Sequence, residues 1–211
     1  MKKIAVVGAT GLVGREIIRL SESFFGKDTE YIFYASERSA GSKLIVNNVE
    51  QTIQLLSIEN IQKVDLALFS AGRKRSREHA KAFINKGAYV VDNSSAFRLE
   101  QEVPLVVYGV NEKVISDDSR LIANPNCTTM ILMMALKPMH DAFGLEQIIP
   151  VSYQAVSGSG LDATNSLEKE NDLGENLNAD YDKGYYGRPI ANNIYQDDLG
   201  ALIGLGPMRL R

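Results

Sequence analysis

The sequence predicts an α/β protein: a mostly parallel sheet with helices on both faces, followed by an incomplete α+β domain. Short apolar runs that end in small or polar residues alternate with helical patterns over residues 1–126. A glycine-rich turn joins the first apolar run to the first helix. The chain becomes polar, glycine-rich and irregular from Gly174 on. We therefore expect a first domain at 1–126 and a second at 127–211.

The expected elements follow the apolar pattern in order. Strands are predicted at 4–7, 31–35, 64–69, 88–91, 105–108 and 121–123. The runs 44–46 and 49–56 flank Asn47-Asn48, which favours a tight hairpin. Helices are predicted after the glycine turn, at 73–86, at 128–137 with its end at Pro138, and at 160–171. A long strand is predicted at 147–156, and no convincing strand at 197–211.

Composition and charge argue against a nucleic-acid-binding protein. The chain has 211 residues, of which 45% are apolar and 23% charged, as in an ordinary globular protein. A net charge of −3 gives no support for nucleic-acid binding. The basic cluster Arg73, Lys74, Arg75 and Arg77 lies on a predicted helix beside Glu78, so a solvated helix face explains it.

Cysteine usage and hydropathy indicate a cytoplasmic protein without membrane partners. One cysteine excludes an intrachain disulfide and fits a reducing compartment. With only two histidines, a transition-metal site is not expected. The apolar run after Lys3 is interrupted at Gly8 and lacks the features of a signal peptide. No stretch approaches the roughly 18 apolar residues that span a bilayer.

The turn at residues 8–14, GATGLVG, predicts a dinucleotide site in a Rossmann-type sheet. It lies between a strand and a helix, where glycines let the backbone approach a pyrophosphate and the helix N-terminus attracts its charge. The alternative is a tight turn without a ligand. At the end of the next strand, Arg38 with Ser36 and Ser39 suits a ribose 2′-phosphate, which favours NADP, while Glu37 leaves NAD open. The alternative for Arg38 is an exposed loop charge.

Cys127 lies in the stretch Asn124 to Thr129, NPNCTT, at a predicted strand-to-helix turn. The helix N-terminus favours a thiolate there, and Asn126 and Thr128 add polar groups. The residue is therefore either a nucleophile or a buried structural thiol. Polar residues also follow the strand at 88–91, where Arg98 could bind an anion. His79 is expected to be a surface or partly packed histidine.

Seven stretches together resemble the aspartate-semialdehyde dehydrogenase family. They fall in order over the chain up to about residue 193: GATGLVG (8–14), SERSAG (36–41), FSAG (69–72), VVDNSSAFR (90–98), NPNCTT (124–129), YQAVSGSG (153–160) and RPIANN (188–193). Acetylglutamyl-phosphate reductases are similar in architecture but differ around the cysteine, so NPNCTT favours the aspartate family.

The resemblance implies an NADP-dependent oxidoreductase and a homodimer formed through a substrate and dimerisation domain. The reaction interconverts L-aspartyl 4-phosphate and L-aspartate 4-semialdehyde plus phosphate through a cysteine thioester, in lysine, threonine and methionine synthesis. It implies that Cys127 is the nucleophile, with Asn126 and the Cys127 N–H as oxyanion donors. Gln154 would orient the substrate, and Asn93 and Arg98 would bind phosphate. The implied cofactor-binding residues are Gly8, Thr10, Gly11, Leu12, Val13, Ser36, Arg38, Ser39, Ser70, Ala71, Gly72, Ser157 and Gly158.

Three departures from the family pattern leave alternatives open. The family carries a catalytic histidine in a later strand, and neither His79 nor His140 lies in its motif. The chain is therefore either the enzyme or a truncated NADP-binding module without catalytic competence. Arg73 stands where the family usually has glycine, and such a side chain either crowds the cofactor or points to solvent. An incomplete second domain predicts self-association, or local disorder after about Asn171.

Overall fold

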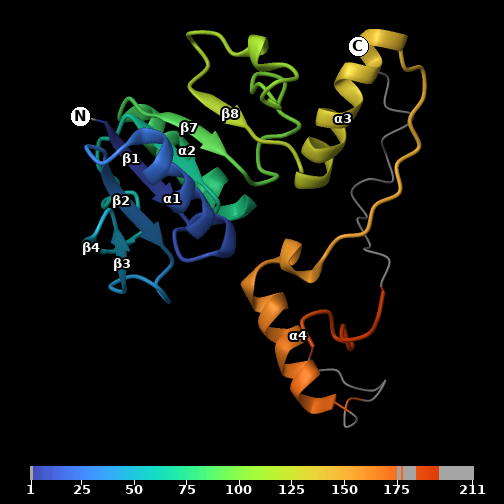
Figure 1. The fold of residues 1–211 in the computed structure, drawn as a ribbon. Coiled ribbons are helices and arrows are strands. Elements are labelled where there is room, and N and C mark those ends of the chain that lie inside the picture. The colour runs from blue at the N-terminus through green and yellow to red at the C-terminus, as the bar shows by residue number, and fades with distance from the viewer. Residues whose placement is uncertain (1, 175–176, 178–183, 195–211) are drawn as a thin grey trace. The chain divides into compact units, whose positions relative to one another are not determined.

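The computed structural model describes residues 2–174, 177 and 184–194 (Figure 1). Contacts divide the chain into two compact units, Met1–Ser152 and Tyr153–Arg211, and each is described by itself. The domain boundary expected between residues 126 and 127 stays a prediction. The irregular tail expected at 197–211 lies outside the described residues, as does most of the region after Gly174. Within the described residues, no helix combines the length and apolar character needed to cross a membrane.

The first unit is built on a six-stranded parallel sheet in the order β5-β2-β1-β6-β7-β8 (Figure 1). Its strands are β1 Lys3–Val7, β2 Glu30–Ala35, β5 Gln54–Leu55, β6 Leu66–Phe69, β7 Tyr89–Asp92 and β8 Leu121–Ala123. The chain continues from β1 to β2 on one side and later returns to β6 on the other. This reversal next to β1 is where ligands bind in open α/β sheets, at the carboxyl ends of the strands.

Helices cover both faces of the sheet, as predicted. Alternate residues of a strand point to opposite faces. On one face Ala5 and Val7 belong to a core cluster with Phe83 of α2 (Arg73–Asn85). On the other, Ile4 and Val6 cluster with Ile18 of α1 (Leu12–Phe25). Burial on both faces explains why β1 is almost continuously apolar.

The predicted hairpin is confirmed. Strands β3 (Lys43–Val46) and β4 (Val49–Thr52) pair antiparallel, and Asn47 and Asn48 adopt φ values of 52° and 62°. Two consecutive positive φ values are the geometry of a type I′ turn, which asparagine tolerates. The single strand expected at 49–56 is divided, because β5 leaves the hairpin and pairs parallel with β2.

The strand predicted at 105–108 is wrong. Only an isolated bridge joins Leu105 to Ala123. The side chain of Asn111 takes over the backbone groups that a strand would pair: its Oδ1 accepts from the Val107 N–H at 2.7 Å, and its Nδ2 donates to the Leu105 carbonyl at 2.9 Å. Such local side-chain bonds favour a turn over a sheet ladder. A 3₁₀ turn, η1 (Glu112–Val114), follows.

The predicted helix end at Pro138 is also wrong, because α3 runs from Cys127 to Phe143 with this proline inside it. Proline removes one hydrogen bond from a helix interior but its φ is helical, so the helix can continue past it at a cost. The helix ends instead at Gly144, which is left-handed with φ 68° and donates its N–H to the His140 carbonyl at 2.8 Å.

The long strand predicted at 147–156 does not form. Among the described residues no strand lies beside it, and a strand needs a partner for its backbone groups. Ile149 and Val151 are therefore more than 80% exposed. Regular structure resumes with a 3₁₀ turn, η2 (Val156–Ser159), and α4 (Leu161–Leu173), close to the expected helix at 160–171.

The second unit is held by a buried carboxylate. Glu170 of α4 is fully buried and accepts hydrogen bonds from the backbone N–H groups of Ile190 and Ala191. Ser166, one turn earlier, accepts from the Tyr185 N–H at 2.9 Å. These bonds fix residues 184–191 against α4 and give the RPIANN stretch a defined place within this unit.

Candidate active site

Because all six strands are parallel, the residues that follow them gather at one edge of the sheet. The residues directly after β1, β2, β5, β6, β7 and β8 are Gly8, Ser36, Leu56, Ser70, Asn93 and Asn124. Segments separated by more than a hundred residues in sequence therefore contribute to the same edge. The predicted cofactor and catalytic motifs lie in these loops.

The glycine turn is shaped by close approaches that a side chain would block. Gly8 has φ 90°, and a Cβ there would lie 2.8 Å from the Ser70 carbonyl carbon. A Cβ on Gly14 would lie 2.1 Å from the Gly8 oxygen, so α1 packs directly on the turn. Gly11 precedes α1 as its cap and brings no side chain to the helix N-terminus. The turn thus leaves backbone N–H groups and a helix dipole for an anion, which fits a dinucleotide pyrophosphate.

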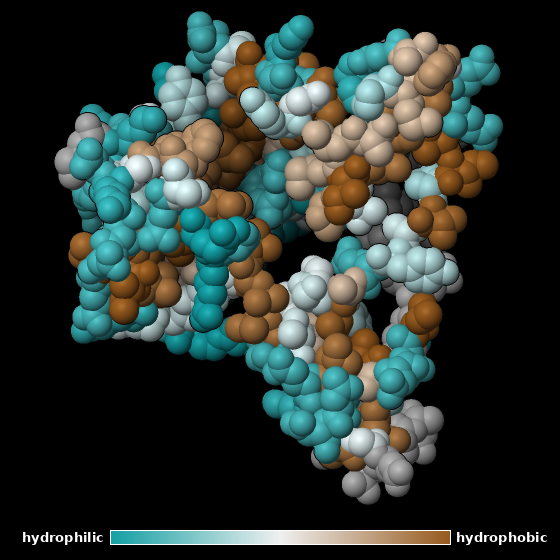
Figure 2. All heavy atoms as spheres, viewed as in Figure 1, coloured by the Kyte–Doolittle hydropathy of each residue, from teal (hydrophilic) through white to brown (hydrophobic). Residues whose placement is uncertain are grey.

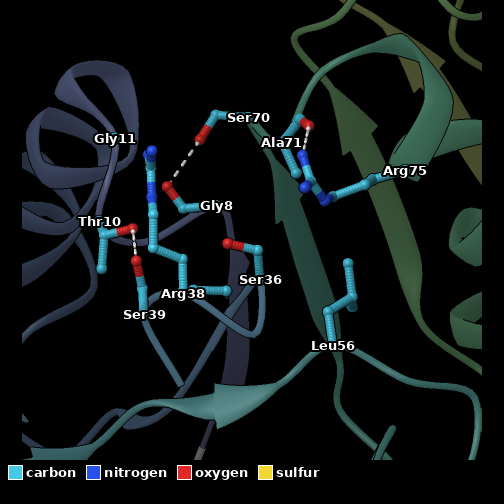
Figure 3. Close-up of a pocket in the computed structure, with 11 residues that line it drawn as sticks. Gly8, Thr10, Gly11, Ser36, Arg38, Ser39, Leu56, Ser70, Ala71 and Arg75 are labelled. Carbon is cyan, nitrogen blue, oxygen red and sulfur yellow. Dashed lines mark hydrogen bonds between the residues drawn. The ribbon is translucent and has the colours of Figure 1, made fainter. Parts of the chain in front are cut away.

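A pocket lies at this edge of the sheet (Figure 3). Eight of the predicted cofactor-binding residues line it: Gly8, Thr10, Gly11, Ser36, Arg38, Ser39, Ser70 and Ala71. Ala35, Leu56 and Arg75 line it as well and were missed in the sequence. Leu12, Val13 and Gly72 do not line it; the first two are exposed at the start of α1, and Gly72 caps α2.

Hydroxyl contacts connect the loops around the pocket. The Thr10 Oγ1 donates to the Ser39 Oγ at 3.3 Å, which joins the glycine turn to the loop after β2 (Figure 3). The N–H groups of Ser39 and Ala40 both donate to the Ser36 carbonyl at 2.9 Å, and this turn carries Arg38 into the pocket. One guanidinium with two serines fits a 2′-phosphate, whereas Glu37 is exposed and does not line the pocket.

Cys127 is the first residue of α3 and is exposed, which opposes the alternative of a buried structural thiol. Asn126 caps the helix, since its Oδ1 accepts from the Thr128 N–H at 2.9 Å. The Thr128 Oγ1 lies 4.0 Å from the Cys127 Sγ. As a donor to an oxyanion, Asn126 would therefore act through its Nδ2 group.

Arg98 is fixed by backbone carbonyls beside this cysteine. Its Nε donates to the Asn124 carbonyl at 2.9 Å and its Nη2 to the Asn93 carbonyl at 3.2 Å. Burial lowers the pKa of the Arg98 guanidinium, and the charges of Asp92 and Cys127 oppose that shift. The Asn124 Nδ2 donates to the Asn93 Oδ1 at 2.6 Å, so the loops after β7 and β8 are joined here. Two bonds use two of the five guanidinium donors, which leaves Arg98 able to bind an anion.

Asp92, at the end of β7, was not singled out in the sequence. It is fully buried, and the hydroxyl groups of Ser76 and Ser94 each donate to one of its oxygens at 2.6 Å. Its neighbour Asn93 was selected by resemblance, but an acidic residue at the end of an apolar strand is itself a signal of a buried polar network.

The other residues named from the sequence lie on α2, on α3 or in the second unit. Gln154, Ser157 and Gly158 belong to the second unit, where a Cβ on Gly158 would lie 2.3 Å from the Gln154 Nε2. His79 is partly buried on α2, as expected, with its Nδ1 2.9 Å from the Arg75 carbonyl oxygen. His140 is exposed near the end of α3. Arg73 is exposed at the start of α2 and does not line the pocket.

Two family models match the chain. The model described as "Semialdehyde dehydrogenase, NAD binding domain" matches residues 3–118, more than half of the chain. The model described as "Semialdehyde dehydrogenase, dimerisation domain" matches residues 136–197. The first covers the pocket and the sheet except for β8, and the second covers the C-terminal part of α3 and the described part of the second unit.

Two of the curated relatives are named aspartate-semialdehyde dehydrogenase. Aspartate-semialdehyde dehydrogenase of Aquifex aeolicus is 43% identical over 171 residues, which cover 80% of this chain and 50% of that protein. The Corynebacterium glutamicum protein of the same name is 45% identical over 213 residues, which cover 92% of this chain and 60% of the relative. The chain thus spans between half and 60% of the length of these relatives.

Solved structures share the fold. Aspartate semialdehyde dehydrogenase II from Vibrio cholerae matches with a TM-score of 0.83 and 33% identity over 94% of this chain and 61% of that one. The Candida albicans enzyme, solved with NADP, matches with a TM-score of 0.58 and 28% identity over 70% of this chain and 49% of that one. With its parallel sheet, its glycine-turn pocket and these matches, the chain belongs to the aspartate-semialdehyde dehydrogenase family.

Proposed function

We propose that this protein acts as an aspartate-semialdehyde dehydrogenase that uses NADP and a Cys127 thioester. The reaction would interconvert L-aspartyl 4-phosphate and L-aspartate 4-semialdehyde plus phosphate, in lysine, threonine and methionine synthesis. One observation carries the proposal: the dinucleotide pocket and the exposed Cys127 follow strands of one parallel sheet and lie at its carboxyl edge. A reaction between a cofactor and a covalently held substrate needs both at one edge.

The chemistry explains the choice of a cysteine. The thiolate adds to the aldehyde carbon and forms a C–S bond, which leaves a thiohemiacetal with a negative oxygen. Loss of a hydride converts this adduct to a thioester, and a bound oxidised nicotinamide would supply the hydride acceptor. Phosphate then attacks the thioester carbon, the C–S bond breaks, and the thiolate is regenerated with aspartyl phosphate as product. The reverse direction uses the same steps and consumes NADPH.

The residues around Cys127 have complementary proposed roles. The Asn126 Nδ2 and the Cys127 N–H would stabilise the oxyanion of the adduct. Arg98 would bind the attacking phosphate, because backbone carbonyls already fix its guanidinium. Asn93 would assist through its Nδ2, since its Oδ1 is engaged with Asn124. Gln154 would orient the substrate by the family resemblance.

For the cofactor, NADP is proposed over NAD. Support comes from Arg38, Ser36 and Ser39, which line the pocket at the end of β2, where the ribose of a dinucleotide lies. The Candida albicans relative was solved with NADP. Ser157 and Gly158 remain proposed cofactor contacts from the second unit.

A second candidate is a cofactor-binding module without turnover. It is favoured by the positions of His79 and His140, which lie on helices and outside the family's histidine motif. An absent acid–base group costs roughly 10²- to 10⁴-fold in rate. Acetylglutamyl-phosphate reductase activity is the further alternative left by the sequence.

The protein is also proposed to act as a homodimer through its dimerisation domain. The family match at residues 136–197 supports this. Within the part of that region that the structure describes, Phe143, Ile149 and Val151 are largely exposed, and such apolar surface is typical of a subunit interface.

The test measures NADPH formation by absorbance with semialdehyde, phosphate and NADP. Turnover by the wild type that is lost in Cys127→Ala supports the enzyme. NADP binding without turnover would support the module instead. Replacement of the semialdehyde by N-acetylglutamate semialdehyde tests the reductase alternative. A variant Cys127→Ala that retains full turnover contradicts the proposed chemistry.

A further inference from the structure

One of the cationic side chains that line the cofactor pocket has no role in the proposed function. Two cationic side chains line it, Arg38 and Arg75, and no carboxylate is among the lining residues, all of which are described. Arg38 lies in the loop after β2 and is the proposed partner of the 2′-phosphate. Arg75 comes from α2 and was interpreted in the sequence only as part of a solvated basic face.

The structure places Arg75 on the wall opposite Arg38. Figure 3 shows Arg75 and Leu56 on one side of the pocket, and Thr10, Arg38 and Ser39 on the other. Arg75 is the third residue of α2, and its Nη1 donates to the Ala71 carbonyl at 3.4 Å. This bond is long, but it turns the guanidinium back over the loop after β6 and toward the pocket.

The two walls differ in chemistry. The wall with Thr10, Arg38 and Ser39 offers hydroxyl groups and a cation, which suit phosphate groups. The wall with Leu56 and Ala71 is apolar apart from the guanidinium of Arg75, and Leu56 is only 9% exposed. An apolar surface beside a planar cation suits a flat aromatic ring, because a guanidinium stacks on the face of such a ring.

We propose that Arg75 is a cofactor-binding residue whose guanidinium stacks on the adenine base of the dinucleotide, with Leu56 against the same base. The proposal rests on the dinucleotide site of the proposed function and assigns the base-binding part of it. It differs from a second phosphate contact, because stacking acts on every adenine dinucleotide, with or without a 2′-phosphate.

The experiment measures dissociation constants of NADP and NAD for the 211-residue chain by isothermal titration calorimetry. Arg75→Ala removes both the charge and the planar guanidinium group. Arg75→Lys keeps the positive charge but replaces the planar group by an ammonium group. Lys74→Ala is the matched control, since Lys74 is its neighbour on α2, its side chain is 88% exposed, and it does not line the pocket.

Stacking predicts that Arg75→Ala raises the dissociation constants of NADP and NAD by the same factor, about 3- to 10-fold. Arg75→Lys should lose most of the same affinity, and Lys74→Ala should bind both like the wild type. A loss confined to NADP would overturn stacking and assign Arg75 to the 2′-phosphate. Unchanged affinities in Arg75→Ala would overturn any role in binding. If the wild type binds neither dinucleotide, the proposed cofactor site fails together with this inference.

Discussion

Asp92 shows how a single buried charge can organise a loop. A carboxylate out of contact with water is tolerated where hydrogen bonds replace its hydration, and Ser76 and Ser94 supply them at 2.6 Å. The Ser94 Oγ also accepts from the Ala96 N–H at 3.0 Å. The carboxylate thus holds the start of the loop that carries Asn93 and Arg98.

We expect Asp92→Asn to lower the free energy of unfolding by about 1–3 kcal/mol, because the amide turns a donor group toward a hydroxyl that donates to the carboxylate. Urea denaturation measures the change. Asp117→Asn, in an exposed loop, is the control and should change stability by less than about 0.5 kcal/mol. Equal stability of the two variants would contradict the structural role of Asp92.

Tyr34 gives a pH prediction. It is fully buried, its hydroxyl donates to the Asn60 carbonyl and accepts from the Gln62 N–H, and burial raises the pKa of its phenol. Above pH ~10 the unfolded chain therefore loses this proton before the folded chain does, so stability falls as the pH rises through the folded pKa. Tyr34→Phe should flatten this alkaline loss in thermal unfolding, while the exposed Tyr108→Phe should keep it. An unchanged slope in Tyr34→Phe would be the contrary result.

At the scale of elements, the turn before α1 and the start of that helix contain glycines with two different roles. An alanine at Gly14 would improve helix propensity by about 1 kcal/mol, but its Cβ would meet the Gly8 oxygen at 2.1 Å. An alanine at Gly11 meets the same oxygen at 3.5 Å, with φ −73°, and fits without strain. Gly14 is therefore required for packing, and Gly11 for access to the pocket.

We expect Gly14→Ala to destabilise the fold by about 1–3 kcal/mol, as overpacking does. Gly11→Ala should unfold like the wild type but bind NADP more weakly, because its methyl group stands at the helix N-terminus in the pocket. Thermal unfolding and titration calorimetry separate the two effects. Gly14→Ala with wild-type stability, or Gly11→Ala with wild-type affinity, would contradict this division.

The α3 helix supplies another prediction at this scale. Pro138 cannot donate to the Met134 carbonyl, so Pro138→Ala should restore one hydrogen bond and strengthen the end of the helix. Amide hydrogen exchange should slow over residues 138–143 and stay unchanged in the distant α1. Faster exchange over 138–143 would mean that the proline ring stabilises α3 in a way that its helical position does not explain.

Helices and strands could be predicted from the sequence where the fold also supplies the partner that the local pattern requires. The strands β1 and β2, the Asn47-Asn48 hairpin and α2 follow directly from apolar runs and turn residues. The conformation of segment 147–156 could not be predicted in this way, because an apolar run forms a strand only if another strand pairs with its backbone groups. Pro138 was misleading for a similar reason: its missing hydrogen bond is a cost that the rest of α3 sustains.

The candidate site was predictable to the extent that motifs carry it. The glycine turn, the Arg38 loop and Cys127 could be selected from spacing and resemblance. Arg75 and Leu56 could not, because they meet only when α2 and β5 take their places around the sheet. Arg75 belongs to a basic helix cluster that looks like a solvated face in the sequence, whereas the position of Asp92 at the end of an apolar strand was a signal that went unused.

At the scale of the whole molecule, exposed apolar surface favours self-association. Figure 2 shows apolar side chains at the surface around α3, where Ile131, Met134 and Phe143 are 75%, 56% and 81% exposed. Burial of one such side chain stabilises an interface by about 1.5–3 kcal/mol. The proposed homodimer would cover part of this surface.

We expect the chain to self-associate in sedimentation velocity experiments and Phe143→Asp to shift it toward monomer. Phe24→Asp is the matched control, since Phe24 is also 81% exposed but lies on α1, outside the dimerisation match. A wild type that remains monomeric at high concentration would argue against the proposed dimer. Equal dissociation by both substitutions would show that the effect is not specific to α3.

If Cys127 is the nucleophile, its acyl-enzyme can be trapped in the absence of the cofactor. Incubation with freshly prepared L-aspartyl 4-phosphate, without cofactor, should transfer one aspartyl group to the chain and release phosphate, independently of hydride transfer. Peptide mass spectrometry should locate the group on Cys127, and Cys127→Ala should remain unmodified. An intact aspartyl phosphate with an unmodified Cys127, or acylation at another residue, would show that Cys127 is not the nucleophile.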